Sequence, residues 1–213
     1  SAIITSLIAL GVILIAFIVT LIDKQVYTDI NKMTLTSLPY FVFIMYVINR
    51  GSVITQAMFI NCDSSMLNYR FYRQPKVILE LFKERLKTLI KINMIPSLVI
   101  AIGLPFLLFV TGGTSNNLNY ILLFISIISL SVFFSVHHLV IYYLLQPYDI
   151  NMKAKSSTYS IVNGITYFIC YLCIDFSYPT LIFATFVTLF SVIYILVALY
   201  LVYKYAYKTF KLK

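Results

Sequence analysis

Apolar runs that are too long for the interior of an ordinary soluble domain dominate this sequence. The first of them, Ala2–Ile22, contains no charged side chain. An α-helix needs about 20 mainly apolar residues to cross the hydrocarbon core of a bilayer. In lipid, only helices and closed barrels satisfy all of their backbone hydrogen bonds. The run therefore predicts a membrane-spanning helix.

Five further apolar runs have, or approach, the length of a span. The chain is 61% hydrophobic and 11% charged, whereas a soluble domain carries about 25% charged residues. The connections between the runs are short, so we expect an all-α, polytopic membrane protein that forms a single transmembrane domain over residues 1–213. The six predicted spans are residues 2–22, 37–61, 92–111, 120–145, 159–174 and 181–203.

The basic residues gather in alternate connections between these spans. Seven lie between spans two and three, two between spans four and five, and four in the tail, whereas only Lys24 and Lys32 lie in connections on the other side. Loops rich in Lys and Arg stay in the cytosol. We therefore expect a multi-pass protein of the bacterial plasma membrane with both termini in the cytosol. The thirteen residues are Arg70, Arg73, Lys76, Lys83, Arg85, Lys87, Lys91, Lys153, Lys155, Lys204, Lys208, Lys211 and Lys213.

The segment 75–91, between spans two and three, is both charged and strongly periodic. Apolar residues from Val77 to Ile90 recur at the spacing of one helix face, and Lys and Glu occupy the opposite face. Pro75 suits the first turn of a helix. We expect an amphipathic helix at the cytosolic surface. It either rests on anionic lipid head groups or binds a cytosolic partner.

Three stretches of the chain carry a resemblance to a known family. They are "NYRFYRQPKVILELFKERLKTLIKIN", "VFFSVHHLVIYYLLQPYDINMKAKS" and "LVYKYAYKTFKLK". Together with six spans and a cytosolic helix, they resemble permease subunits of bacterial ABC exporters of the ABC-2 type. The resemblance implies that residues 75–91 are the coupling helix that docks on an ATP-binding subunit. It also implies that the chain is the C-terminal part of a longer permease. The implied coupling residues are Lys76, Glu80, Leu81, Phe82, Lys83, Glu84 and Lys87.

An energy source for transport is not encoded in this sequence. It contains no G-x-x-x-x-G-K-[ST] loop that could cradle the phosphates of ATP. The resemblance therefore implies a separate ATP-binding cassette subunit, which would carry ATP and Mg, and a second permease half or copy as partners in the bilayer. For this chain we expect no cofactor, no catalytic residue and no metal site. We also expect no nucleic acid partner, because membrane topology accounts for the net charge of +9.

Three basic residues fall inside the predicted spans. Arg50 lies in span 37–61, where a charge costs on the order of 3 kcal/mol. It is either a substrate or gating contact, or it extends to the cytosolic surface from a shorter span. His137 and His138 lie in span 120–145. Each is either packed against a hydroxyl or carbonyl group, or part of a proton relay or substrate contact.

An alternative function is intramembrane peptide processing. Cys62 would be the nucleophile, and His137 or His138 would be its base. Two features count against this interpretation. The neighbouring Asp63 is acidic, whereas a reactive cysteine typically lies beside basic groups. The histidines also lie deeper in the predicted membrane than the cysteine. A nucleophile and its base must come within hydrogen-bonding distance of each other, which gives a geometric test.

Overall fold

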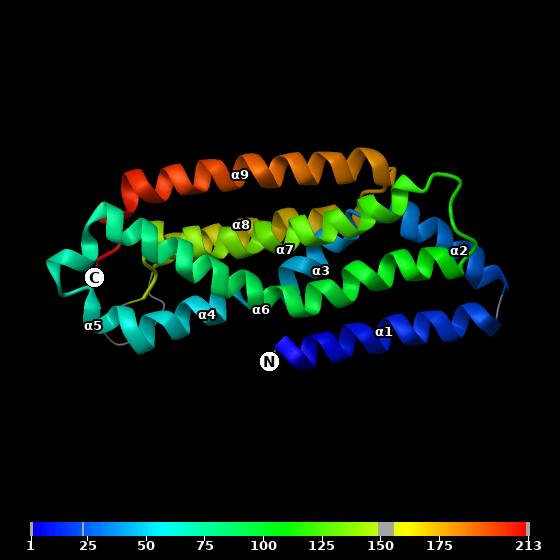
Figure 1. The fold of residues 1–213 in the computed structure, drawn as a ribbon, viewed down its shortest axis with the longest axis horizontal. Helices are drawn as coiled ribbons and strands as arrows, with labels where there is room; N and C mark the ends of the chain where they lie inside the picture. Colours follow the sequence, from blue (N-terminus) through cyan, green and yellow to red (C-terminus); the bar gives the residue numbers. More distant parts are fainter. Residues whose placement is uncertain (1, 23, 149–155, 212–213) are drawn as a thin grey trace.

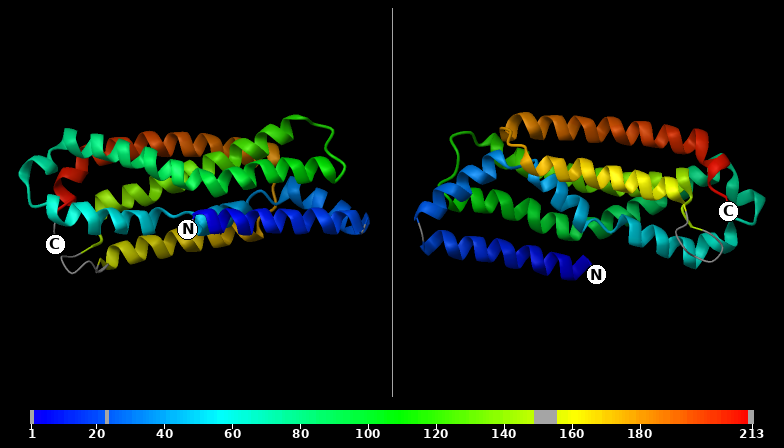
Figure 2. Two further views of the ribbon diagram at one scale, coloured as in Figure 1. Left: turned by 60° about the horizontal axis from the view of Figure 1, so that its bottom comes forward. Right: turned by 180° about the vertical axis from the view of Figure 1, so that it is seen from behind.

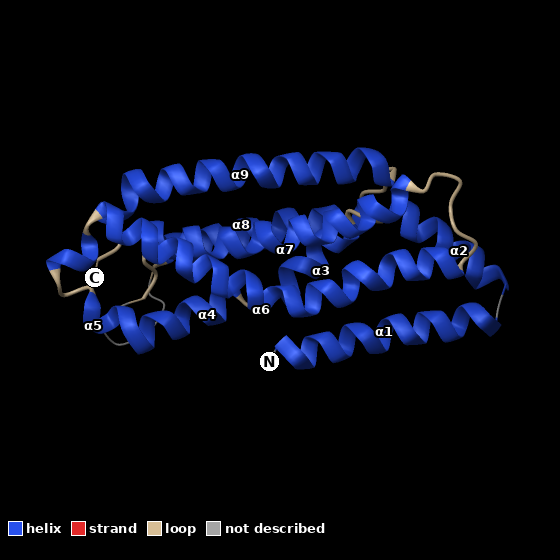
Figure 3. Cartoon of the chain, viewed as in Figure 1, coloured by secondary structure: helices blue, strands red, loops and turns tan. Residues whose placement is uncertain are grey.

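Helices formed by these apolar runs make up the structure. The computed structural model describes residues 2–22, 24–148 and 156–211, and this part of the chain consists of helices and loops without a strand (Figure 3). Six of its helical segments are long and apolar enough to cross a membrane, as the sequence predicts. In chain order the elements are α1 (Ala2–Ile22), α2 (Lys24–Thr36), α3 (Tyr40–Ile48), α4 (Gly51–Met58), η1 (Phe59–Asp63), α5 (Ser64–Met66), η2 (Arg70–Arg73), α6 (Pro75–Val110), α7 (Leu118–Leu145), α8 (Ser157–Leu172), η3 (Cys173–Asp175) and α9 (Thr180–Thr209).

The long helices lie side by side along one axis (Figure 1). α7 packs against both α6 and α9, and these three helices form the centre of the bundle. α1 packs along α6, where Gly103 allows close approach because an added Cβ would lie 2.2 Å from a methyl group of Ile13. α8, in yellow in the right panel of Figure 2, covers the side that is hidden in Figure 1.

The segments that carry most of the basic residues lie at one end of the bundle. The beginning of α6 and the end of α9 are at this end, and α2 and the loop before α7 are at the other (Figure 1). The predicted topology requires this separation, although Lys153, Lys155 and Lys213 lie outside the described residues. Placement of the basic end in the cytosol remains a prediction.

The predicted span 37–61 is not one continuous helix. α3 ends at Ile48, and Asn49 adopts an extended conformation with φ −65° and ψ 131°. The Asn49 side chain accepts a hydrogen bond of 2.8 Å from the backbone N–H of Gly51, the first residue of α4. Such local side-chain bonds compete with helical ones. The second half of the span then passes into η1, a turn of π-helix.

The predicted amphipathic helix 75–91 and the predicted span 92–111 form a single helix. α6 runs for 36 residues without a break, and Pro75 occupies its first turn as expected. Pro96 and Pro105 lie inside it and do not end it. A displacement at the beginning of α6 can therefore be carried along the helix into the bundle.

Candidate functional site

The first half of α6 has two distinct faces. One face is buried in the bundle and includes Ile78, Phe82 and Leu89. The other face projects outward and carries charges. We call five of its exposed residues, Lys76, Glu80, Lys83, Glu84 and Lys87, the charged stripe of α6.

The implied coupling residues therefore divide into exposed and covered ones. The five residues of the charged stripe are exposed, Leu81 is half-buried and Phe82 is fully buried. The Phe82 ring contacts the Tyr143 ring at 5.4 Å between centroids. Phe82 can thus support the stripe from behind, but its side chain does not present a surface to a partner.

Lys87 and Glu84 form an ion pair of 2.6 Å within the stripe. Their side chains are 65% and 70% exposed, so the pair contributes little to stability. The sequence pattern also places Glu80 and Lys83 three residues apart, but no ion pair joins them. The carboxylate of Glu80 is accordingly free to face a basic group on a partner.

Arg85 departs from the pattern of the charged stripe. It follows Phe82 by three residues and precedes Leu89 by four, which places it on the buried face of α6. Its side chain is only 11% exposed. The charge pattern places Arg85 among the predicted cytosolic charges, and this buried role was not predicted. The signal was present, because a charge on the apolar face of an amphipathic helix needs a partner.

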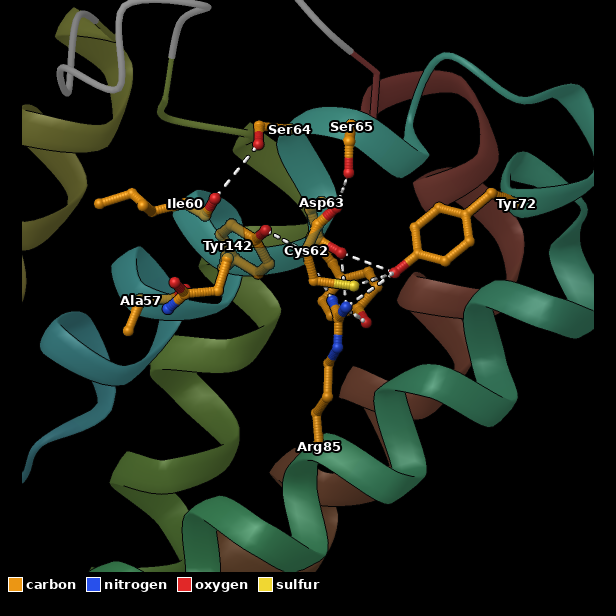
Figure 4. A network of polar contacts seen from close by, with 11 residues as sticks. Ala57, Ile60, Cys62, Asp63, Ser64, Ser65, Tyr72, Arg85 and Tyr142 are labelled. Atoms are coloured by element: carbon orange, nitrogen blue, oxygen red, sulfur yellow. Dashed lines mark hydrogen bonds and ion pairs between the residues drawn. The ribbon is translucent and has the colours of Figure 1, made fainter.

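That partner is Asp63 in η1. Arg85 donates hydrogen bonds of 2.7 Å from Nη1 and 2.5 Å from Nη2 to the two carboxylate oxygens (Figure 4). The hydroxyls of Tyr72 and Tyr142 also donate to Asp63, the former at 2.6 Å. Asp63 is completely buried, and four donor groups satisfy its oxygens. We call these residues, together with Tyr143, the Asp63 cluster.

The tyrosine hydroxyls of the cluster also bind Arg85. The guanidinium donates to the hydroxyl of Tyr72 at 2.8 Å and to that of Tyr143 at 2.9 Å. Burial raises the pKa of Tyr72, and its hydrogen bond to Asp63 raises it further. Tyr72 therefore stays a neutral hydroxyl that can donate to the carboxylate and accept from the guanidinium at once.

The Asp63 cluster connects four parts of the chain. Asp63 comes from η1, Tyr72 from η2, Arg85 from α6, and the other two tyrosines from α7. Phe210, which follows α9, stacks on Tyr143 with ring centroids 4.5 Å apart. Removal of one partner from a buried ion pair leaves a costly unpaired charge. The cluster therefore holds the beginning of α6 in one position relative to α7 and α9.

A second polar region surrounds the break between α3 and α4. The Asn93 side chain accepts a hydrogen bond of 2.9 Å from the backbone N–H of Arg50 and donates one of 3.0 Å to Ser135. Ser97 donates to Ser131 at 2.8 Å. The first contact binds the broken span to α6, and the other two bind α6 to α7. They also satisfy a backbone donor that a continuous helix would have used internally.

Arg50, for which a substrate or gating contact is one of the two interpretations, makes no side-chain hydrogen bond to any residue that the structure describes. Its Nε atom is buried and has no partner among the described residues. No described acidic residue forms an ion pair with it. Arg50 is half-buried. An unpaired basic group at such a position in a membrane protein marks a candidate ligand contact.

The two predicted histidines differ in their surroundings. His137 is within hydrogen-bonding distance of two hydroxyls, Tyr194 at 2.8 Å and Thr166 at 3.0 Å. This matches the interpretation of a histidine packed against hydroxyl groups. His138 is buried and stacks on Tyr46, and a Cβ added at Gly51 would lie 2.4 Å from its own Cβ. His138 thus packs directly on the first residue of α4.

The structure does not bring the residues of the peptide-processing alternative together. The Cys62 sulfur lies 3.9 Å from the Tyr72 hydroxyl, and the hydrogen bonds of His137 go to Tyr194 and Thr166 instead. Cys62 precedes the completely buried Asp63, whose carboxylate forms an ion pair with Arg85. Across residues 2–22, 24–148 and 156–211, no three His, Cys, Asp or Glu side chains are grouped to bind a metal.

Comparisons with protein-family models, with curated proteins and with solved structures found no match.

Proposed function

We propose that this chain is a membrane-spanning subunit of an ATP-driven exporter and that the charged stripe of α6 docks on a separate ATP-binding subunit. Hydrolysis of ATP would take place on that partner. The chain would supply the path through the bilayer and the helix that responds to closure of the partner. The resemblance of the sequence to ABC-2 permeases motivates this proposal.

The observation that carries it is the direction in which the apolar face of α6 points. A helix that rests on a membrane surface buries its apolar face among the lipids. The apolar face of the first half of α6 is instead covered by its own chain, because Ile78 and Phe82 pack in one core with Tyr143 and Val202. The charged face of this segment is therefore the one left to contact a partner.

The composition of the charged stripe also favours a protein partner over a lipid surface. Anionic lipid attracts basic groups and repels carboxylates. Two of the five stripe residues, Glu80 and Glu84, are acidic and exposed. A mixed pattern of both signs is typical of surfaces that select a partner by charge complementarity.

The continuity of α6 and the Asp63 cluster would transmit a displacement of the charged stripe to the membrane-spanning bundle. The helix that carries the stripe continues to Val110, and Arg85 ties it to Asp63. Docking on the stripe would therefore move a rigid body that includes part of the membrane-spanning bundle. Rigid-body movements of this kind are a common means of switching between two states.

The test is a charge reversal on the stripe with a charge reversal elsewhere as its control. Glu80→Lys places a basic group where we expect a basic groove on the partner. Asp175→Lys makes the same change in charge at an exposed residue of η3. A candidate ATP-binding subunit is co-expressed and co-purified with each variant, and substrate-stimulated ATP hydrolysis is measured after reconstitution.

We expect Glu80→Lys to reduce both co-purification and stimulated hydrolysis at least tenfold, and Asp175→Lys to leave both unchanged. A lipid-resting helix would give the opposite result, since an added basic group strengthens binding to anionic lipid. If Glu80→Lys retains full co-purification and coupling, the charged stripe is not the docking surface.

A further inference from the structure

An elongated cavity of about 600 Å³ lies between α1, α2, α3 and α6. Side chains of α1 line it from Thr5 to Ala16, so it extends roughly 16 Å along that helix at a rise of 1.5 Å per residue. The opposite walls include Ile44 and Ile48 of α3 and Leu104 of α6. Its volume lies within the range of about 300–1,000 Å³ that is typical of sites for small molecules.

Apolar groups line almost the whole of this cavity. The hydroxyl of Thr5 donates to the carbonyl of Ala2 at 2.8 Å, and that of Thr34 donates to the carbonyl of Ile30 at 2.8 Å. Both hydroxyls are thus occupied within their own helices. Apart from Tyr40, the remaining lining residues are aliphatic or aromatic hydrocarbons or methionine. The shape and the lining together fit an extended hydrocarbon chain.

A basic residue follows closely after one of the residues that line the cavity. Ile48, the last residue of α3, lines the cavity. Arg50 follows two residues later, so their Cα atoms are at most about 7.6 Å apart. The guanidinium Nε is buried and unpartnered, and Arg50 has no ion pair with any described acidic residue. The Arg50 side chain is long enough to span that separation.

We propose that this cavity binds an anionic amphiphile with a single hydrocarbon chain. The chain would lie along α1, and the acidic head group would pair with the guanidinium of Arg50 at the break between α3 and α4. The inference rests on the proposed function, in which this amphiphile belongs to the class of exported substrates. A bilayer phospholipid would instead keep its head group at the membrane surface, away from an interrupted span.

Two interactions would contribute to the free energy of binding. Removal of the hydrocarbon chain from water supplies affinity without selectivity, because it depends on apolar area alone. The unpaired guanidinium supplies selectivity, since a charge-assisted hydrogen bond forms with an acid but not with the corresponding alcohol. The site should consequently discriminate between two ligands that differ only in the charge of the head group.

The experiment measures equilibrium binding of radiolabelled dodecanoate and dodecanol to the purified chain in a neutral detergent at pH 8. Three variants accompany the native sequence. Arg50→Gln removes the charge beside the cavity, Ala9→Phe fills the cavity from α1, and Arg70→Gln removes an exposed charge elsewhere as a matched control. Thermal unfolding of every variant establishes that it is folded before binding is compared.

We expect saturable binding of dodecanoate with at least tenfold weaker binding of dodecanol. Arg50→Gln should weaken dodecanoate binding at least tenfold and leave dodecanol unchanged, Ala9→Phe should weaken both, and Arg70→Gln should change neither. Binding that does not saturate, or that Arg50→Gln leaves intact, overturns the inference, and so does full binding by folded Ala9→Phe. Because no ATP-binding subunit is present, failure here is distinct from failure of docking on the charged stripe.

Discussion

The two terminal nitrogens of the Arg85 guanidinium donate hydrogen bonds of 2.7 and 2.5 Å to the two carboxylate oxygens of Asp63, although the residues lie 22 positions apart in the chain. In this bidentate pair, the Asp63 side chain is completely buried and the Arg85 side chain is 11% exposed. It fixes the part of α6 that carries the charged stripe to the π-helical turn η1.

Arg85→Met should destabilise the folded chain by about 3–5 kcal/mol, because it leaves the buried Asp63 carboxylate without its counter-ion. The loss is measured by reversible unfolding in mixed detergent micelles. Arg70→Met, at an exposed position in η2, is the control and should change the free energy of unfolding by less than about 0.5 kcal/mol. The double variant Asp63→Leu with Arg85→Met should be more stable than Arg85→Met alone. Equal stability of Arg85→Met and the native chain would contradict a structural role for the pair.

Tyr142→Phe should cost about 1–3 kcal/mol, since it deletes a hydroxyl that donates to the buried carboxylate of Asp63. Tyr203→Phe makes the same chemical change at an exposed position of α9 and should be neutral. The same unfolding measurement compares the two variants. A cost for Tyr203→Phe as large as for Tyr142→Phe would show that the Asp63 hydrogen bond is not the cause.

Gly51→Ala should destabilise the chain by about 1–3 kcal/mol, because the new methyl group would meet the Cβ of His138 at 2.4 Å. Gly164 in α8 provides the control, as nothing lies within 4 Å of a Cβ added there. Gly164→Ala should stabilise the helix by about 0.5–1 kcal/mol. Unfolding of both variants tests the packing of His138 on the first residue of α4, and equal effects would contradict it.

Asn116→Cys should react with a membrane-impermeant thiol reagent added outside intact cells, whereas Lys208→Cys should react only after the membrane is opened. Both positions are exposed and lie in segments at opposite ends of the bundle. The background lacks Cys62, Cys170 and Cys173, each replaced by alanine. Labelling of Lys208→Cys in intact cells would reverse the predicted orientation.

Several features of this protein follow from the sequence alone. The six apolar helices and the amphipathic character of residues 75–91 were predicted because apolar length and helical periodicity are local properties of the chain. The five exposed residues of the charged stripe were identified in the same way. The interpretation of His137 as packed against a hydroxyl also agrees with its contacts to Tyr194 and Thr166.

Other features required the tertiary structure. The break after Ile48 is stabilised not only by the local bond of Asn49 but also by Asn93, which comes from another helix and accepts a hydrogen bond from the backbone N–H of Arg50. No local pattern records such a partner. Phe82 appears in the sequence beside exposed charges, yet packing against Tyr143 removes it from the surface.

The Asp63 cluster shows most clearly what only the fold decided. The sequence indicates that Arg85 is a charge on an apolar helix face, but it does not reveal which carboxylate pairs with it. Asp63 is brought to Arg85 by η1 and η2, and Tyr142 joins them from 79 residues away. A buried charge is tolerated only where all of its hydrogen-bonding partners converge. That convergence is a property of packing between distant segments, so it became visible only in three dimensions.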